Sequence, residues 1–229
     1  IILFCGAAGS GKDTAFTILR AILKKIDEDD VSPVYVSQFA FGRPLKEIVV
    51  DLCQLFLNEQ YSLDEMNRFT YKEVERPEHT VYPDPDPAHS EPLIIRRLLQ
   101  IVGTDFLRKR LGDDVFASAV LRDIDSFFES SGQGGGGTQI ACVTDLRFPN
   151  EQKCIREYCD ARGYNCVTVY IRRRVTSPTA RTYVHVSESH YDQLEKNVVI
   201  ENCGTLEDLE HEVRGLVSYL LAKLKPERG

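Results

Sequence analysis

Short apolar runs alternate with amphipathic stretches along this chain of 229 residues. Continuous apolar runs bounded by polar or turn residues are typical of buried β-strands. They occur at residues 1–4, 34–39, 140–144, 166–171 and 198–200. We therefore expect five strands, of which 140–144 has the uninterrupted apolar character of a central parallel strand.

Between these runs, apolar residues recur three and four positions apart, which predicts helices. The stripes cover residues 15–26, 44–56, 94–106, 115–128 and 206–224. Ser90 is the expected N-cap of the third helix, with Pro92 in its first turn. Thr205 and Asp208 have the spacing of a capping box at the start of the last helix.

The alternation of strands and helices predicts one α/β domain over 1–229, with a parallel sheet of about five strands and helices on both faces. Its core comprises residues 1–40, 139–171 and 197–229. The crossover 41–138 is long enough for an inserted helical subdomain that binds a second substrate. Within it, the Pro- and Asp-rich stretch 77–92 suits either a flap or a linker, and a Gly-rich run at 130–138 suits a flexible tether.

The segment Cys5-Gly-Ala-Ala-Gly-Ser-Gly-Lys-Asp-Thr14 joins the first strand to the first helix. Strand, Gly-rich loop and helix are the context in which a P-loop motif is informative. Glycines allow several backbone N–H groups to point at phosphate oxygens, and the helix N-terminus adds partial positive charge. We expect residues Gly9, Ser10, Gly11, Lys12, Asp13 and Thr14 to bind ATP, with Lys12 spanning its β- and γ-phosphates.

One position departs from the usual G-x-x-x-x-G-K-[ST] pattern, because Asp13 follows Lys12 and Thr14 comes one residue later. A carboxylate thus replaces the hydroxyl that usually binds magnesium. Asp13 would hold Mg²⁺ directly or through water, or would orient Lys12. Asp145 directly follows the apolar run 140–144, as a Walker B carboxylate does. We expect Asp13 and Asp145 to hold the Mg²⁺ that accompanies ATP.

Composition narrows the classes of function. The hydrophobic fraction of 42% and the charged fraction of 28% are those of a globular protein. The formal charge of −7 argues against nucleic acid as a partner. No apolar run approaches the ~20 residues of a membrane span, and no secretory leader is visible. Seven scattered cysteines without a C-x-x-C pair favour free thiols in a reducing compartment, so we expect a cytoplasmic protein. Whether the protein forms a homodimer stays open at the level of sequence.

Two groups of basic residues suggest a reaction between two phosphorylated substrates. Arg172-Arg173-Arg174 follows the fourth strand and opens a polar segment, 172–190, which we expect to act as a lid. In a phosphotransferase such guanidinium groups neutralise the transferring phosphoryl group and exclude water. Lys46, Arg96 and Arg108 lie in the long crossover, where they could hold the acceptor phosphate.

A series of short motifs, in order over nearly the whole chain, resembles the deoxynucleoside monophosphate kinases known from phages. They are the P-loop with Asp13, Pro44-Leu-Lys46, Arg96-x-x-Leu-Gln100, Gly103-Thr-Asp105-x-x-Arg108, Thr144-Asp-Leu-Arg-Phe-Pro-Asn-Glu151, His185-Val-Ser-Glu188 and Val199-Ile-Glu-Asn202. The resemblance implies a P-loop NTPase three-layer sandwich of the adenylate-kinase type. It also implies transfer of the ATP γ-phosphoryl group to a deoxynucleoside 5′-monophosphate.

The resemblance also assigns roles to single residues. The catalytic residues would be Lys12, Asp13, Asp145 and Arg172, with Arg174 as a further ATP ligand in the lid. The acceptor site would comprise Lys46, Arg96, Gln100, Arg108, Arg147, Glu151 and Glu188. The amide of Gln100 could hydrogen-bond the base, because it offers both a donor and an acceptor. For Gln100 and Glu188, packing or capping roles remain alternatives.

Two other functions stay open at the level of sequence. Animal-type phosphomevalonate kinases share the Ser-Gly-Lys-Asp loop, the Pro-Leu-Lys-Glu match at 44–47 and an Ile-Glu-Asn ending. The intact Arg147-Phe-Pro-Asn-Glu151 and Gly103-Thr-Asp105 favour the nucleotide enzyme. A P-loop switch protein that signals by conformation is the other alternative, although the chain contains no N-K-x-D guanine-binding motif.

Overall fold

The computed structural model describes residues 1–7, 9–29, 33–57, 61–63, 65–66, 80–82, 93–132, 137–173 and 190–224. The chain forms two compact units. One comprises residues 1–40 and 120–229, and the other residues 41–119. The first contains the P-loop, and the second contains most of the long crossover.

A five-stranded parallel sheet is the centre of the first unit. Its strands are β1 (Ile2–Cys5), β2 (Val34–Phe39), β5 (Thr138–Leu146), β6 (Val167–Arg172) and β7 (Val198–Glu201). They are arranged in the order β2-β5-β1-β6-β7, and every pairing is parallel. The five strands expected from the apolar runs are therefore confirmed, and β5 extends past Asp145 to Leu146.

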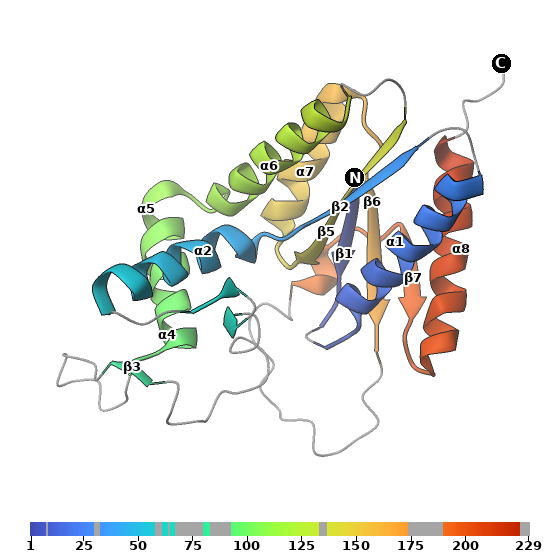
Figure 1. Ribbon diagram of the computed structural model, residues 1–229. Helices are drawn as coiled ribbons and strands as arrows, with labels where there is room; N and C mark the ends of the chain where they lie inside the picture. Colours follow the sequence, from blue (N-terminus) through green and yellow to red (C-terminus); the bar gives the residue numbers. More distant parts are fainter. Residues whose placement is uncertain are drawn as a thin grey trace. The chain divides into compact units, whose positions relative to one another are not determined.

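Helices cover both faces of this sheet (Figure 1). On one face lie α1 (Lys12–Asp29) and α8 (Leu206–Leu224), which pack against each other and against the strands. Leu19, Leu23 and Leu216 are at most 2% exposed in the resulting core. Burial of each such side chain contributes about 1.5–3 kcal/mol to folding. The Thr205–Asp208 capping box at α8 is confirmed, since each residue's side chain accepts the other's backbone N–H.

The opposite face carries α7 (Pro149–Arg162) and the later part of α6 (Val115–Gly132). Tyr158 of α7 donates a 2.6 Å hydrogen bond to Asp125 of α6. The apolar periodicity did not predict α7, because most of its residues are polar and its apolar stripe is narrow. Its termini are nevertheless marked, by Pro149 in the first turn and by Gly163 with a left-handed φ of 67° behind the last residue.

The second unit is largely helical. It contains α2 (Gly42–Leu52), the π-helix η1 (Cys53–Leu57), α4 (Ile95–Gln100), the π-helix η3 (Ile101–Arg108), α5 (Lys109–Leu111) and the first residues of α6. A small antiparallel pair, β3 (Thr80–Tyr82) and β4 (Leu93–Ile94), precedes α4. The core of the second unit joins Val49 and Cys53 to Ile95, Leu98 and Leu99, all of which are buried.

Two helical stripes predicted from the sequence were partly wrong. Ile94 lies in β4, and the helix begins at Ile95. Phe56 and Phe106, expected on buried faces, are 78% and 59% exposed. Both lie in π-helices, where hydrogen bonds from i to i+5 widen the turn and rotate later residues off the α-helical stripe. Ser90, Pro92, the rest of the 77–92 stretch outside β3, and residues 133–136 lie outside the described residues.

Within the described part of the chain, none of the helices combines the length and apolarity that a membrane crossing requires.

Candidate functional site

The loop between β1 and α1 turns at three glycines with positive φ. Gly6, Gly9 and Gly11 adopt φ values of 141°, 73° and 101°, which residues with a side chain rarely adopt. A Cβ on Gly6 would collide with the carbonyl oxygen of Ile171 in β6 and lie 2.8 Å from Ser10 Oγ. Glycine is therefore required at Gly6 for the loop to lie against the sheet.

Lys12 lies at the first position of α1 and reaches back over this loop. Its Nζ donates hydrogen bonds of 2.8 Å to the carbonyl oxygens of Gly6 and Ala7. Burial lowers the pKa of Lys12 below 10.5, and the nearby Arg147 guanidinium lowers it further. Asp13 and Asp145 act in the opposite direction and raise this pKa. The ammonium group is thus within electrostatic range of one guanidinium and both predicted magnesium ligands.

The carboxyl ends of β1, β2 and β5 converge beside Lys12, since the three strands are parallel neighbours. Asp145 is half-buried near the end of β5, and Arg147 follows it. Gln38, near the end of β2, donates hydrogen bonds to Asp13 Oδ1 (3.3 Å) and to Thr144 Oγ1 (2.9 Å). In open parallel sheets this edge is where ligands bind.

Other contacts hold the far side of the P-loop. Asn202, directly after β7, donates a 2.7 Å hydrogen bond from its side-chain Nδ2 to the carbonyl oxygen of Ser10. Its own backbone N–H donates to the carbonyl oxygen of Arg172 at 2.8 Å. A Cβ on Gly11 would collide with the same amide. Asn202 therefore ties the loop to the ends of β6 and β7.

The arginines after β6 divide between two partners. Arg172 forms an ion pair with Glu201 on the neighbouring strand, and its Nε donates at 2.8 Å. Arg173 instead donates a 3.3 Å hydrogen bond to the carbonyl oxygen of Gly9. Of the two arginines that the structure describes here, Arg173 thus contacts the P-loop and Arg172 contacts β7. Arg174 and Glu188 lie outside the described residues.

Glu151 is one of the predicted acceptor ligands, yet its carboxylate points toward the backbone. It is 2% exposed, and its Oε2 accepts hydrogen bonds from the N–H groups of Arg147 (3.2 Å) and Phe148 (3.1 Å). These N–H groups precede or begin α7, where intrahelical partners are lacking. Glu151 thereby holds the turn that carries Arg147 beside Lys12.

The remaining predicted acceptor residues belong to the second unit. Gly103 is buried against Leu45, whose Cδ2 would lie 2.6 Å from a Cβ at position 103. This close approach of α2 and η3 brings the helix of Lys46 beside the helices that carry Arg96, Gln100 and Arg108. Arg108 donates to the carbonyl oxygen of Asp113 at 3.2 Å and lies over the ring of Phe116.

Lys46 and Gln100 are half-buried. Arg96 lies in α4, where the structure describes its backbone but not its side chain. The second unit therefore groups the predicted acceptor residues Lys46, Gln100 and Arg108 on helices that pack together.

Magnesium fits the residues at the P-loop. Mg²⁺ in nucleotide enzymes is held by one or two carboxylates together with phosphate oxygens and water. Asp13 and Asp145 supply two carboxylates within electrostatic range of Lys12. The described residues contain no cluster of three or more His, Cys, Asp and Glu of the kind that holds a metal without a nucleotide.

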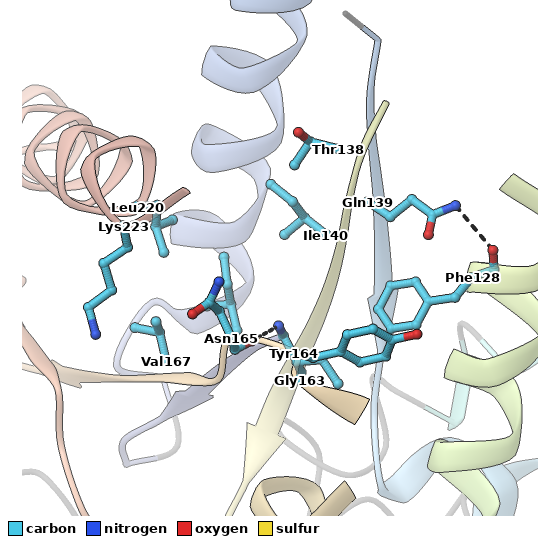
Figure 2. A pocket seen from close by; sticks show the side chains of 12 residues that line it. Phe128, Thr138, Gln139, Ile140, Gly163, Tyr164, Asn165, Val167, Leu220 and Lys223 are labelled. Atoms are coloured by element: carbon cyan, nitrogen blue, oxygen red, sulfur yellow. Dashed lines mark hydrogen bonds between the residues drawn. The ribbon is translucent and has the colours of Figure 1, made fainter. Parts of the chain in front are cut away.

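A separate cavity of about 340 Å³ lies at the amino ends of the strands (Figure 2). Phe128, Tyr164 and Leu220 are among its lining residues. Two of its polar groups are already bonded within the protein, since Gln139 Nε2 donates to Phe128 O and Asn165 O accepts from the amino group of Ile1. The lining includes Lys223 but no Asp or Glu side chain, in contrast to the P-loop region.

Sequence reasoning assigned no individual role to Gln38 or Asn202, and it treated Arg173 only as one member of the lid triplet. The strongest signals were positional. Gln38 is a polar residue near the end of an otherwise apolar run, and Asn202 directly follows the Val-Val-Ile-Glu strand. Polar residues at the carboxyl ends of parallel strands lie at the ligand-binding edge of the sheet.

A family model described as deoxynucleotide monophosphate kinase matches residues 50–213, which is more than half of the chain. The match begins after the P-loop, so the P-loop assignment rests independently on the loop's sequence and conformation. No sequence among curated proteins matches at a significant level.

Similar solved structures include the Mycobacterium tuberculosis APS kinase CysC in complex with AMPPNP and APS, at 14% identity and a TM-score of 0.43, covering 95% of this chain and 96% of that one. The dephospho-CoA kinase from Campylobacter jejuni has 10% identity and a TM-score of 0.43, with 98% of both chains covered. A Janibacter sugar kinase has 12% identity and a TM-score of 0.38, with coverage of 96% and 92%. At these values they support no inference about substrate or mechanism.

Proposed function

The chain belongs to the deoxynucleotide monophosphate kinase family, and we propose that it transfers the γ-phosphoryl group of ATP to a deoxynucleoside 5′-monophosphate at the P-loop. The observation that supports this site most directly is Lys12, whose Nζ lies over the loop carbonyls of Gly6 and Ala7 and whose pKa responds to Arg147, Asp13 and Asp145. Opposite charges are gathered where a polyphosphate and its cation need them.

The proposed mechanism is mainly one of alignment and charge neutralisation. An oxygen of the acceptor 5′-phosphate attacks the γ-phosphorus of ATP, the bond to the β–γ bridging oxygen breaks, and ADP leaves. Residues Gly9 to Thr14 cradle the phosphates of ATP, and Lys12 exchanges its present carbonyl partners for phosphate oxygens. These contacts with the phosphate oxygens become more favourable as negative charge develops on the transferring phosphoryl group.

Asp13 and Asp145 would hold Mg²⁺. When bound, this ion would neutralise negative charge on the β- and γ-phosphates of ATP. Because Asp13 stands where other P-loop enzymes carry a hydroxyl, the protein contributes one more negative charge to this side of the nucleotide. Lys12 and Arg147 offset that charge.

The resemblance to phage kinases assigns Lys46, Arg96, Arg108 and Arg147 to the acceptor phosphate and Gln100 to the base. Arg172 to Arg174 would begin the lid. The Arg173–Gly9 hydrogen bond supports a role for this triplet beside the ATP phosphates.

The family match favours a nucleotide acceptor over phosphomevalonate. The test is ADP release from ATP and Mg²⁺ with each deoxynucleoside monophosphate and with phosphomevalonate in turn. We expect release with at least one deoxynucleoside monophosphate and none above background with phosphomevalonate. Release with phosphomevalonate alone would reject the proposed acceptor.

Lys12→Ala is the companion variant. Loss of a preorganised cationic donor at the transferring group should lower kcat by about 100-fold or more. Circular dichroism and the urea midpoint should stay near wild type, because Lys12 is not part of the apolar core. Lys153→Ala, which removes an exposed lysine of α7, is the matched control and should retain full activity.

A further inference from the structure

The side chain of Gln38 links the start of α1 to the end of β5. These two segments carry Asp13 and Asp145, the predicted magnesium ligands. Gln38 pairs with Cys142 of β5, and Thr144 is two residues further along the same strand. Alternation along a strand places Cys142 and Thr144 on one face of the sheet, and Cys142 is buried in the core that includes α1. The Gln38 side chain therefore extends along the face covered by α1, whose first turn contains Asp13.

The hydrogen bonds determine how this amide is oriented. An ionised carboxylate can only accept, so the nitrogen of the Gln38 amide must face Asp13. Its two N–H groups are matched by two acceptors, Asp13 Oδ1 at 3.3 Å and Thr144 Oγ1 at 2.9 Å. Thr144, which provides this hydroxyl, is 4% exposed and immediately precedes Asp145 in the sequence.

We propose that Gln38 is a positioning residue for the metal–nucleotide complex. It holds Asp13 by Oδ1 against the end of β5, so that the Asp13 and Asp145 carboxylates keep a constant separation before ATP arrives. The inference rests on the proposed function, which assigns both carboxylates to magnesium. Gln38 itself acts through Asp13 and touches no reacting atom.

Direct metal binding tests the proposal without relying on activity. Mn²⁺ replaces Mg²⁺ as a paramagnetic probe, and the enhancement of water-proton relaxation measures how much of the Mn²⁺–AMPPNP complex is bound to the protein. Gln38→Leu removes both hydrogen bonds at nearly constant volume. We expect about tenfold weaker Mn²⁺ binding, the usual effect of losing a group that orients a metal ligand. Ser37→Ala, the neighbouring position on the opposite face of β2, should bind as wild type does.

A double-mutant cycle separates positioning from a general disturbance. If Gln38 acts through Asp13, Gln38→Leu combined with Asp13→Asn should bind Mn²⁺ within twofold of Asp13→Asn alone. Thr144→Val, which removes the other anchor of the same amide, should weaken binding in the same direction. It serves as the second variant should Gln38→Leu fold poorly.

The outcomes distinguish this inference from the function on which it rests. Wild-type Mn²⁺ affinity in Gln38→Leu, or losses that multiply in the double variant, would overturn the role of Gln38. If Asp13→Asn and Asp145→Asn also bind Mn²⁺–AMPPNP as wild type does, the assigned magnesium residues fail as well. If Asp145→Asn alone weakens binding, the proposed function stands, and only the roles assigned to Gln38 and Asp13 are rejected.

Discussion

At the scale of single residues, the P-loop shows why one atom can decide a site. Gly6 lies against the Ile171 carbonyl of a neighbouring strand, and a Cβ at this position would also lie 2.8 Å from Ser10 Oγ. A peptide oxygen held in a sheet cannot move aside as a flexible side chain can. Only the absence of Cβ lets β1 turn into the phosphate loop at this point.

Gly6→Ala should therefore distort the loop. A left-handed φ together with the backbone contact should cost about 1–3 kcal/mol of unfolding free energy. We expect at least tenfold weaker binding of a non-hydrolysable ATP analogue in isothermal titration calorimetry. Gly163→Ala is the control, since its φ is also positive but no atom lies within 4 Å of its Cβ position. Equal effects of the two variants on binding would contradict the role of Gly6.

The charge of Lys12 is also set by named neighbours. Its pKa lies below that of an exposed lysine because of burial first and Arg147 second. In the pH window between the lowered folded pKa and 10.5, the unfolded chain binds more protons than the folded one. The contribution of Lys12 to stability therefore rises with pH across this window and is least favourable below it.

Arg147→Gln should raise the pKa of Lys12, because it removes the largest lowering effect after burial. The measurement is a pH titration of ¹³C-labelled lysine side chains by NMR, with Lys12→Ala identifying the resonance. An unchanged Lys12 pKa would mean that Arg147 lies too far away to influence the ammonium group.

At the scale of elements, helix termini explain several of the motifs. The Arg-Phe-Pro-Asn-Glu sequence at 147–151 contains an N-terminal Pro and a Glu that accepts from the backbone before the helix. The motif thus builds the start of α7 and, through it, positions Arg147. The sequence contained these capping signals, but its apolar spacing was too weak to predict the helix itself.

Glu151→Ala should destabilise the protein by about 1–3 kcal/mol, because it leaves two N–H groups near the helix terminus without their acceptor. Glu151→Gln, which keeps an acceptor oxygen, should lose less. Urea denaturation measures both. A rise in KM for the deoxynucleoside monophosphate in Glu151→Gln at unchanged stability would instead favour direct contact with substrate, as the resemblance to phage kinases implied.

Like α7, the π-helices η1 and η3 were not foreseen by the periodicity of the sequence. Both arise inside stretches whose apolar spacing suits an ordinary α-helix. Packing of Gly103 against Leu45 occurs within η3, where a tight contact between helices is formed. The apolar spacing of these stretches therefore did not show where the hydrogen-bond pattern changes to i+5.

At the scale of the whole molecule, the distribution of thiols reports on the fold. All seven cysteines are free, and their exposure differs. Cys203 is exposed, Cys154 and Cys166 are half-buried, and the other four are buried. Burial raises the pKa of Cys5 and of Cys142 to about 12, so both remain as unreactive thiols at neutral pH.

In native protein treated with a thiol reagent, exposed Cys203 should therefore react before the four buried cysteines, and Cys5 and Cys142 should react only after denaturation. Mass spectrometry of timed samples gives the order, and a denatured sample should show all seven thiols. Early modification of Cys142, which lies in the central strand β5, would contradict the burial of this sheet.

The sequence by itself determined the five strands, the P-loop, the capped helix α8 and the family resemblance. These features depend on local spacing, on turn chemistry and on short motifs, each of which lies within a few consecutive residues. Membership of the deoxynucleotide monophosphate kinase family confirms the function they predicted.

Only the tertiary structure decided which polar groups meet. The Gln38–Asp13 contact joins residues 25 positions apart, the Arg173–Gly9 contact 164 and the Asn202–Ser10 contact 192. Each depends on the order of strands in the sheet. A local pattern states which face a side chain occupies, but the partner on that face is chosen by packing of distant segments.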